Sequence, residues 1–449
     1  MFSKVNSTTI QGLSAHIVTV ETDVGNGLPI FEMSGYLASE VKEARERVRV
    51  AIKNAGIELR PQRIVVNISP ADIRKDGTGF DLPIAIGILA ANGVVSLDKL
   101  EGSVIIGELS LDGTVNSVNG ILPSVCAAKE QGYTRCIMPM ADIHEGSIIS
   151  EIEVLGTASL RELVDYLNDD TQLACGYSAV TRDMKTDALD GDIIIDRASV
   201  IARDNIMDED GVSGEDYALD KEDFLDIKGQ HAAKRATLIA VAGMHNIMYV
   251  GSPGSGKTML ARRIPTIMPE LTFDESLELT KIYSVAGQLN KKSPIITSRP
   301  FRSPHHNVTQ AALIGGGRIP RAGEITLAGK GVLFLDEITE YKPETLEALR
   351  QPLEDKSVTI VRLNSSYTYP ADFMLAAAMN PCKCGYYPDR NRCNCSEHEI
   401  QRYLGKISRP MWDRFDLCVQ VGSVSFSEIN GQEECKTKAS KRCSKDEIF

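Results

Sequence analysis

A glycine-rich octapeptide places the tightest limit on what this chain can fold into. It reads Gly251, Ser252, Pro253, Gly254, Ser255, Gly256, Lys257 and Thr258. The apolar run 247–250 before it predicts a buried strand, and residues 259–263 after it predict the start of a helix. In this context the backbone N–H groups and the helix N-terminus surround phosphate oxygens. We therefore predict a nucleoside triphosphate site, with Lys257 on the β- and γ-phosphates and Thr258 on Mg²⁺.

Two carboxylates and an amide follow apolar strands farther along the chain. Residues 331–335 form a predicted strand that ends in Asp336 and Glu337, and residues 374–379 form another that ends in Asn380. Asp336 is predicted to complete the Mg²⁺ shell and Glu337 to polarise an attacking water. Asn380 is predicted to orient that water or to sense the γ-phosphate, although Asn-Pro also commonly begins a turn. This set of groups predicts hydrolysis as well as binding.

Several further stretches resemble one family of ATPases. They are Asp226 to Gln230, Phe301 to His306, Gly315 to Gly317, Pro320 to Ile325, Leu349 to Glu354 and Asp413 to Asp416. Together with the motifs above, they resemble the magnesium-chelatase-like AAA+ ATPases known as the ComM or YifB family. The resemblance implies a P-loop α/β core with a parallel sheet, and a homo-oligomer, a hexameric ring, with ATP between neighbours.

The same resemblance gives Arg414 the role of an arginine finger. Such a residue enters the neighbouring subunit's site and stabilises charge in the transition state. Arg409 stands where the family usually has a small residue, so a second arginine lies nearby. The alternative is a surface ion pair of Arg414 with Asp413 or Asp416.

The first 165 residues predict a separate α/β domain. Apolar segments 64–68 and 103–107 occur among helical stretches such as 39–55. The domain resembles the proteolytic domain of the Lon family, with the α/β fold of the ribosomal protein S5 type, in three stretches: 76–81, 107–113 and 119–121. The serine and lysine that carry proteolysis in that family fall here on Gly79 and Leu122. Because neither residue can act as nucleophile or base, we expect an assembly module that is not a protease and whose protein partner is unknown.

Negative charge is concentrated between the two predicted domains. Residues 165–223 hold 17 acidic and 5 basic residues, an excess that equals the net charge of −12 of the whole chain. We predict a Lon-like domain (1–165), an acidic linker (166–222), an ATPase core (223–422) and a polar, disordered tail (423–449). A typical family member continues into a helical lid at this tail, so the resemblance implies that the lid is missing.

Two segments between the nucleotide motifs are candidates for binding a DNA substrate. Residues 301–330 are rich in glycine, proline and arginine, and residues 358–369 alternate like a hairpin with a polar turn. In related ring helicases both elements point into the pore and grip DNA. Lys356 and Arg362 are candidates for phosphate contacts and Tyr367 for base stacking. An ordinary hairpin with solvated side chains is the alternative.

Four cysteines follow Asn380 as two Cys-x-Cys pairs. They are Cys382, Cys384, Cys393 and Cys395. Four thiolates can enclose one Zn²⁺ as a structural site, and free or redox-active thiols are the alternative. His305 and His306 are adjacent and lack a spacing that would place both on one metal.

These patterns predict a cytoplasmic ATPase that uses ATP and Mg²⁺ and has no membrane contact. No charged-then-apolar leader opens the sequence, and its longest apolar stretch, 82–95, is too short to span a bilayer. The resemblance implies a DNA helicase for single-stranded or branched DNA that drives branch migration during natural transformation. A magnesium-chelatase-like ATPase that remodels a protein partner is a second hypothesis. A nucleotide-binding protein that lacks turnover without the lid is a third.

Overall fold

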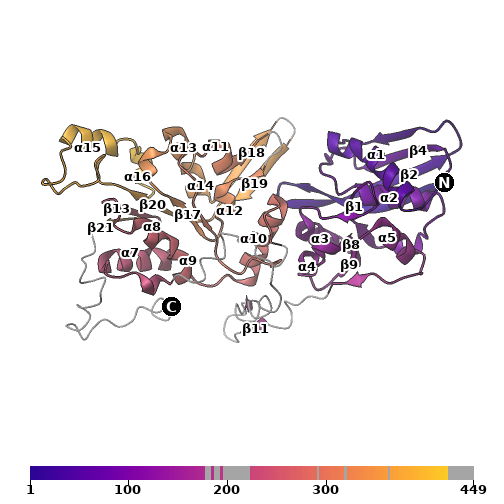
Figure 1. The fold of residues 1–449 in the computed structure, drawn as a ribbon, viewed down its shortest axis with the longest axis horizontal. Helices are drawn as coiled ribbons and strands as arrows, with labels where there is room; N and C mark the ends of the chain where they lie inside the picture. The colour runs from indigo at the N-terminus through magenta and orange to yellow at the C-terminus, as the bar shows by residue number, and fades with distance from the viewer. Residues whose placement is uncertain are drawn as a thin grey trace. The chain divides into compact units, whose positions relative to one another are not determined.

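The computed structural model describes most of the chain. The described residues are 1–176, 184–186, 193–195, 223–290, 293–317, 321–362 and 365–422, and they include strands β11 (Met184–Thr186) and β12 (Ile193–Ile195). Most of the predicted acidic linker, and the whole tail from which a missing lid was inferred, lie outside them. Two compact units are present: residues 1–199 with 276–296, and residues 200–275 with 297–449 (Figure 1). No helix in the described part is long and apolar enough to cross a membrane.

The first unit is built on an eight-stranded mixed sheet. Its strand order is β10-β9-β8-β5-β1-β2-β4-β3. The strands are β1 (Phe2–Gln11), β2 (Ser14–Gly25), β3 (Phe31–Ser34), β4 (Arg63–Ser69), β5 (Ser103–Ile105), β8 (Arg135–Pro139), β9 (Glu153–Thr157) and β10 (Ala174–Cys175). β1 and β2 form an antiparallel hairpin whose tight turn needs the positive φ of 63° at Gly12. The predicted strands 64–68 and 103–107 are confirmed as β4 and β5.

Helices cover this sheet and complete its core (Figure 1). They are α1 (Ser39–Asn54), α2 (Asp81–Ala91), α3 (Ile121–Glu130), α4 (Ile143–Gly146) and α5 (Leu160–Leu167), and a short hairpin of β6 (Glu108–Leu109) and β7 (Val115–Asn116) accompanies them. α1 confirms the predicted helix 39–55. Every residue of α2 is buried, so the longest apolar stretch of the sequence is a core helix. α5 continues to Leu167 and β10 pairs with β9, so the ordered fold of this unit extends beyond residue 165.

One helix that follows the phosphate-binding loop in sequence packs with the first unit. Residues 276–296, which include most of α10 (Phe273–Ala286), belong to that unit. The Ser284 hydroxyl donates to the Glu145 carboxylate at 2.6 Å, and the backbone N–H of Leu122 donates to the same oxygen at 2.8 Å. The backbone N–H of Gly120 donates to the Ser284 carbonyl at 3.3 Å. The start of α3, which carries the position of the Lon-family lysine, therefore holds α10.

Replacing Glu145 by glutamine is expected to make the packing of α10 less sensitive to pH. Burial raises the pKa of Glu145, against the opposing hydrogen bonds from Ser284 and Leu122. A carboxyl whose folded pKa is raised destabilises the fold above that pKa, and this cost disappears as the pH falls toward the ordinary value of 4.5. Amide hydrogen exchange of α10, corrected for intrinsic rates, should show greater protection in Glu145→Gln than in the wild type at pH 8. The two proteins should converge near pH 5, and a constant difference would contradict the role of this carboxyl.

The second unit contains a five-stranded parallel sheet with the order β14-β17-β20-β13-β21. The strands are β13 (Ile247–Gly251), β14 (Phe301–Arg302), β17 (Val332–Leu335), β20 (Met374–Met379) and β21 (Leu417–Val421). β13, β17 and β20 are almost entirely buried and apolar, as strands of a parallel sheet covered on both faces must be. All three were predicted, and the parallel α/β core is confirmed.

Helices and two hairpins surround the sheet. They are α7 (His231–Ala242), α8 (Lys257–Arg262), α9 (Ile264–Ile267), α11 (Gln310–Ile314), α12 (Glu324–Leu327), α13 (Pro343–Glu347), α14 (Arg350–Asp355), α15 (Glu397–Leu404) and α16 (Arg409–Trp412), with hairpins β15 (Gly315–Gly316)/β16 (Arg321–Ala322) and β18 (Ser357–Arg362)/β19 (Ser365–Pro370). In Figure 1, α7, α8 and α9 lie on one side of the sheet, and α13, α14 and α16 lie on the other. Since β13, β20 and β17 are neighbours, the residues that follow them meet at one sheet edge.

Candidate nucleotide site

The phosphate-binding loop joins β13 to α8, as its motif predicts. Gly254 and Gly256 have φ values of 74° and 90°, which favour glycine and let the loop fold back over the start of α8. The Lys257 ammonium donates to the carbonyl oxygens of Gly251 and Ser252 at 2.8 and 2.9 Å. It also donates to the side-chain oxygen of Asn380 at 3.2 Å. The loop and the end of β20 therefore meet at Lys257.

Hydroxyl and carboxylate oxygens meet on the other side of the loop. The Thr258 hydroxyl donates to Asp336 at 2.8 Å, so two oxygen ligands of the kind that Mg²⁺ prefers lie together. Glu337 has a φ of 48°, which is uncommon for a residue with a side chain, and its N–H donates to Asp336 at 2.9 Å. This turn leaves Asp336 half-buried and Glu337 exposed. Asp336 is thus placed to bind a cation, and Glu337 is accessible to water.

Two further groups of the loop fit an anionic ligand. Burial lowers the pKa of Lys257, and the nearby carboxylates Asp336 and Glu337 oppose that shift. The Ser255 hydroxyl is buried, and among the described residues it has no hydrogen-bond partner. A phosphate group would satisfy this hydroxyl and favour the charged form of the lysine.

Two residues that the motif analysis gave no role hold the site in place. The Gln230 side chain donates to the carbonyl of Ser255 at 3.2 Å and to that of Gly422 at 2.6 Å, so it ties the loop to the end of β21. Asn246 precedes β13; its side chain donates to the carbonyl of Arg414 and accepts from the N–H of Leu375, both at 2.9 Å. These contacts fix the neighbouring strands around β13. Gln230 belongs to a stretch on which the family resemblance was based, whereas Asn246 carries no local signal.

Arg414 lies just after α16 and forms an ion pair with Glu354 of α14. Its side chain is 30% exposed, and its Nε atom is buried without a hydrogen-bond partner in the described part of the chain. The aspartates considered as alternative partners do not form this pair: Asp416 accepts from the backbone N–H of Asn246 at 2.8 Å. Arg414 is thus held at the amino-terminal end of β21, at the opposite end of the strands from Asp336 and Asn380.

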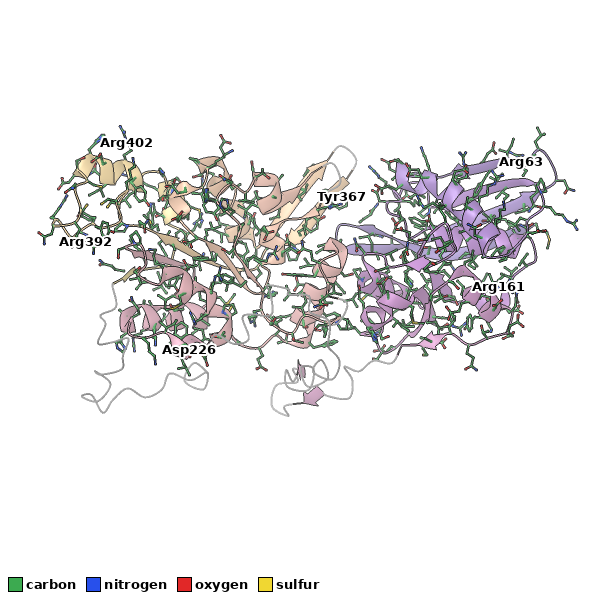
Figure 2. All side chains as sticks on the ribbon, viewed as in Figure 1. Arg63, Arg161, Asp226, Tyr367, Arg392 and Arg402 are labelled. Atoms are coloured by element: carbon green, nitrogen blue, oxygen red, sulfur yellow. The ribbon has the colours of Figure 1, made fainter. Side chains whose placement is uncertain are left out.

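The candidate DNA-contacting residues lie on or beside the β18–β19 hairpin. Lys356 immediately precedes β18, is 69% exposed and forms an ion pair with Asp372 at 2.9 Å. Tyr367, labelled in Figure 2, shares one face of β19 with the buried Tyr369 and is itself half-buried. Arg362 ends β18, and its side chain lies outside the described part. The predicted hairpin is confirmed, and Lys356 is the more accessible of the two candidates with described side chains.

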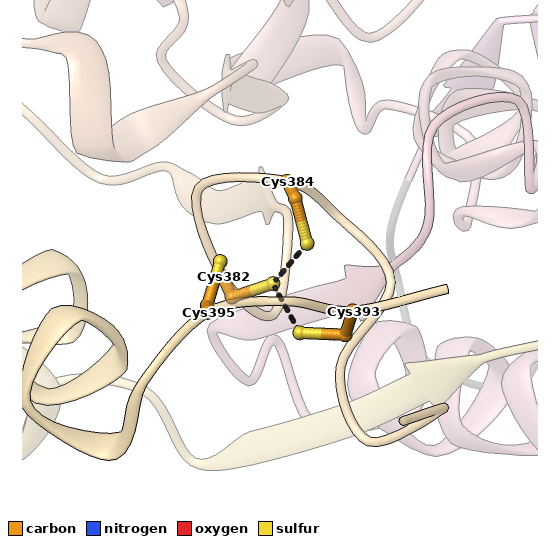
Figure 3. Close-up of side chains that lie close together, drawn as sticks. All are labelled: Cys382, Cys384, Cys393 and Cys395. Carbon is orange, nitrogen blue, oxygen red and sulfur yellow. Dashed lines mark hydrogen bonds between the residues drawn. The ribbon is translucent and has the colours of Figure 1, made fainter. Parts of the chain in front are cut away.

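The four cysteines are brought together, as their sequence pattern predicts. Their sulfur atoms all lie within 4.8 Å of one another (Figure 3). Cys382 Sγ lies 3.2 Å from that of Cys384 and 3.7 Å from that of Cys393. A tetrahedral Zn²⁺ site with Zn–S bonds of 2.3 Å requires sulfur separations of about 3.8 Å. Burial raises the pKa of the Cys382 thiol, but hydrogen bonds, first among them that from the backbone of Tyr387, lower it overall to about 6.

The stretch Phe301 to His306, on which the family resemblance also rests, makes contacts within the fold and does not show ligand geometry. Arg302 makes a two-bond ion pair with Glu324, with distances of 2.7 and 2.9 Å, and so joins β14 to the start of α12. The rings of His305 and His306 lie 4.0 Å apart, and His306 meets the edge of Tyr341. Within the described residues, the four-cysteine cluster is the group close enough to share one metal.

Comparison with known proteins agrees with this geometry. The family described as "Magnesium chelatase, subunit ChlI" matches residues 223–429, and "Subunit ChlI of Mg-chelatase" matches residues 20–142. Competence protein ComM of Haemophilus influenzae is 39% identical over 418 residues, which cover 93% of this chain and 76% of ComM. YifB of Escherichia coli is 36% identical over 441 residues, which cover 97% of this chain and 80% of YifB.

A more distant similarity points to the same class. The magnesium-chelatase 67 kDa subunit of Chlorobaculum parvum is 26% identical over 170 residues, which cover 35% of this chain and 23% of that subunit. The fold and the site define a magnesium-chelatase-like AAA+ protein, a class whose members use ATP and Mg²⁺. Within that class the chain belongs to the ComM/YifB family.

Proposed function

We propose that this protein is an ATP-hydrolysing motor that assembles into a hexameric ring and moves single-stranded or branched DNA during recombination. The observation that carries the proposal is the convergence of Lys257, Thr258, Asp336 and Asn380 at one sheet edge, with Glu337 exposed beside them. The similarity to a competence protein supports DNA as the substrate and natural transformation as the setting. Cytoplasmic localisation is part of the same proposal.

The mechanism is an in-line attack of water on the γ-phosphate. Glu337 accepts the proton of that water, because its carboxylate is exposed and anchored to Asp336 through the backbone. Lys257 exchanges its contacts with the loop carbonyls for phosphate oxygens and neutralises their charge. Asn380 holds Lys257 in the ligand-free chain and orients the water when the lysine turns to phosphate.

The metal ligands and the neighbouring subunit complete the site. Thr258 and Asp336 would hold Mg²⁺, which when bound neutralises charge on the β- and γ-phosphates. Arg414 of one subunit stabilises the transition-state charge in the next. Zn²⁺ is the metal that we propose for the four-cysteine cluster, because four clustered thiols suit it and the Cys382–Cys393 separation of 3.7 Å is close to that of a tetrahedral site.

Steady-state ATP hydrolysis with and without single-stranded DNA tests the proposed function, with Glu337→Gln as the blank. A rate that rises with DNA supports a nucleic-acid motor. A basal rate indifferent to DNA contradicts it and favours a remodelling ATPase that acts on a protein, as the similarity to a magnesium-chelatase subunit would suggest. Nucleotide binding without a rate above the blank contradicts both motors and leaves a non-hydrolysing protein.

Replacing Lys356 by alanine is expected to weaken DNA binding mainly at low salt. Each lost phosphate contact reduces the slope of log K against log salt concentration by about 1. Lys42→Ala, which removes an exposed lysine from α1, is the matched control and should leave that slope unchanged. Fluorescence anisotropy with labelled single-stranded DNA across a salt series measures both variants. Equal slopes for wild type and Lys356→Ala would show that this lysine serves only its ion pair with Asp372.

A further inference from the structure

The four-cysteine loop and the helix that follows it contact two elements of the nucleotide site and continue directly from the third. The loop runs from Cys382 to Cys395 and begins two residues after Asn380. α15 follows directly, capped at its N-terminus by Ser396, whose hydroxyl accepts from the N–H of Glu399. The loop and α15, which we call the cysteine module (residues 382–404), therefore continue from the strand end that touches Lys257.

The first contact is with the phosphate-binding loop itself. Gly385 has a φ of 84°, and a Cβ atom added to it would lie 2.5 Å from Cδ of Pro253. The backbone of the cysteine module thus packs directly against the proline ring of the phosphate-binding loop. Only glycine permits this approach, both because of the positive φ and because no space remains for a side chain. Any shift of Gly385 must therefore move Pro253 or leave it unsupported.

The second contact reaches the segment that follows the catalytic carboxylates. The Thr339 hydroxyl, two residues beyond Glu337, donates to the Tyr403 hydroxyl on α15 at 2.8 Å. Tyr403 therefore joins α15 to the segment after β17. Through Gly385 and Tyr403, one small module supports both the phosphate-binding loop and the carboxylate turn.

The buried core of the cysteine module is small. Its buried core consists of Cys382, Cys393 and Ile400, with partly buried Cys384, Tyr386, Cys395 and Leu404 packed against them. Four of these seven residues are the clustered cysteines, so the core includes the cysteine side chains as its largest group. Such a loop gains its folding free energy from a metal, because a site of four thiolates forms only when the chain is ordered around the ion.

We propose that Zn²⁺ bound by Cys382, Cys384, Cys393 and Cys395 fixes the phosphate-binding loop, so that nucleotide affinity depends on zinc occupancy. This rests on the proposed nucleotide site but not on hydrolysis or on DNA. The metal acts through position alone: it holds Gly385 against Pro253 and Tyr403 against Thr339. Loss of zinc frees the module, and the loop then spends part of its time in conformations that cannot surround phosphate.

The test combines zinc content with nucleotide affinity on the same preparations of the full chain. Zinc is measured by elemental mass spectrometry, and affinity by titration with a fluorescent ATP analogue. The double variant Cys393→Ser/Cys395→Ser should lose its zinc and bind nucleotide about tenfold more weakly or worse. Cys175→Ser, an exposed cysteine of the first unit, is the matched control and should retain both properties. Removal of zinc from the wild type by a chelator, followed by its return, should lower and then restore affinity.

Gly385→Ala separates the contact from the metal. This variant should keep its zinc and still lose nucleotide affinity, because its methyl group collides with Pro253. Wild-type protein without zinc, zinc-free protein with unchanged affinity, or Gly385→Ala with wild-type affinity would each overturn the proposal. Failure of the nucleotide site itself has a different signature: wild type and Lys257→Ala would bind the analogue equally, whatever their zinc content.

Discussion

The Glu337→Gln variant is expected to hydrolyse ATP about 10²–10⁴-fold more slowly than the wild type while binding ATP with similar affinity. The amide keeps the size and turn geometry of Glu337 but cannot accept a proton from water. ATP affinity should persist, because the groups that contact phosphate and metal are Lys257, Thr258 and Asp336, whose mutual contacts do not involve the Glu337 side chain. Single-turnover hydrolysis and equilibrium binding of a fluorescent analogue measure the two quantities separately.

A second glutamate of the same unit gives the control for this prediction. Glu344→Gln changes an exposed carboxylate at the start of α13 and should leave both rate and affinity unchanged. A Glu337→Gln rate within tenfold of the wild type would mean that another group activates the water. A parallel loss of rate and ATP affinity would instead assign Glu337 to binding, which its exposed position beside Asp336 does not favour.

The parts of the site that could be predicted from the sequence are those specified by a short run of neighbouring residues. A strand, a glycine-rich loop and a helix specify the position of Lys257 within a few residues, because the loop must turn at glycines with positive φ. Asp336 and Asn380 follow apolar strands, and parallel strands bring their carboxyl ends to one edge. The sequence pattern therefore suffices to predict that Lys257, Asp336 and Asn380 lie close together. The hydrogen bonds from Lys257 to Asn380 and from Thr258 to Asp336 agree with this prediction.

The remaining features depend on contacts between segments that are far apart in sequence. Glu354 as the partner of Arg414, Gly385 against Pro253, and α10 on the turn near Leu122 have no local signature. Each depends on which surfaces meet once the strands have paired, and hydrophobic periodicity carries no such information. The predicted start of the linker at residue 166 followed acidic charge. The structure places α5 beyond this point because its apolar residues pack in the first unit, and β10 because its backbone pairs with β9.

Replacing Arg414 by alanine is expected to reduce ATP turnover about 10³–10⁵-fold, as loss of an arginine finger does, with ATP affinity retained. In the single chain Arg414 pairs with Glu354, and Asn246 holds its backbone carbonyl, so the side chain starts from a fixed position beside β21. Arg409→Ala is the control, because it removes the exposed arginine of α16 that lies nearest in sequence. If Arg409→Ala lost more activity than Arg414→Ala, the finger would have to be reassigned to Arg409.

Mixing two inactive variants tests whether Arg414 acts on the neighbouring subunit. In a head-to-tail ring, each site combines Glu337 of one subunit with Arg414 of the next. Rings assembled from equal amounts of Glu337→Gln and Arg414→Ala chains should therefore regain activity, because roughly a quarter of their interfaces contain both native residues. Each variant alone should remain inactive at the same total concentration. If Arg414 served the site of its own chain, no interface would hold a complete set, and the mixture would be as inactive as its components.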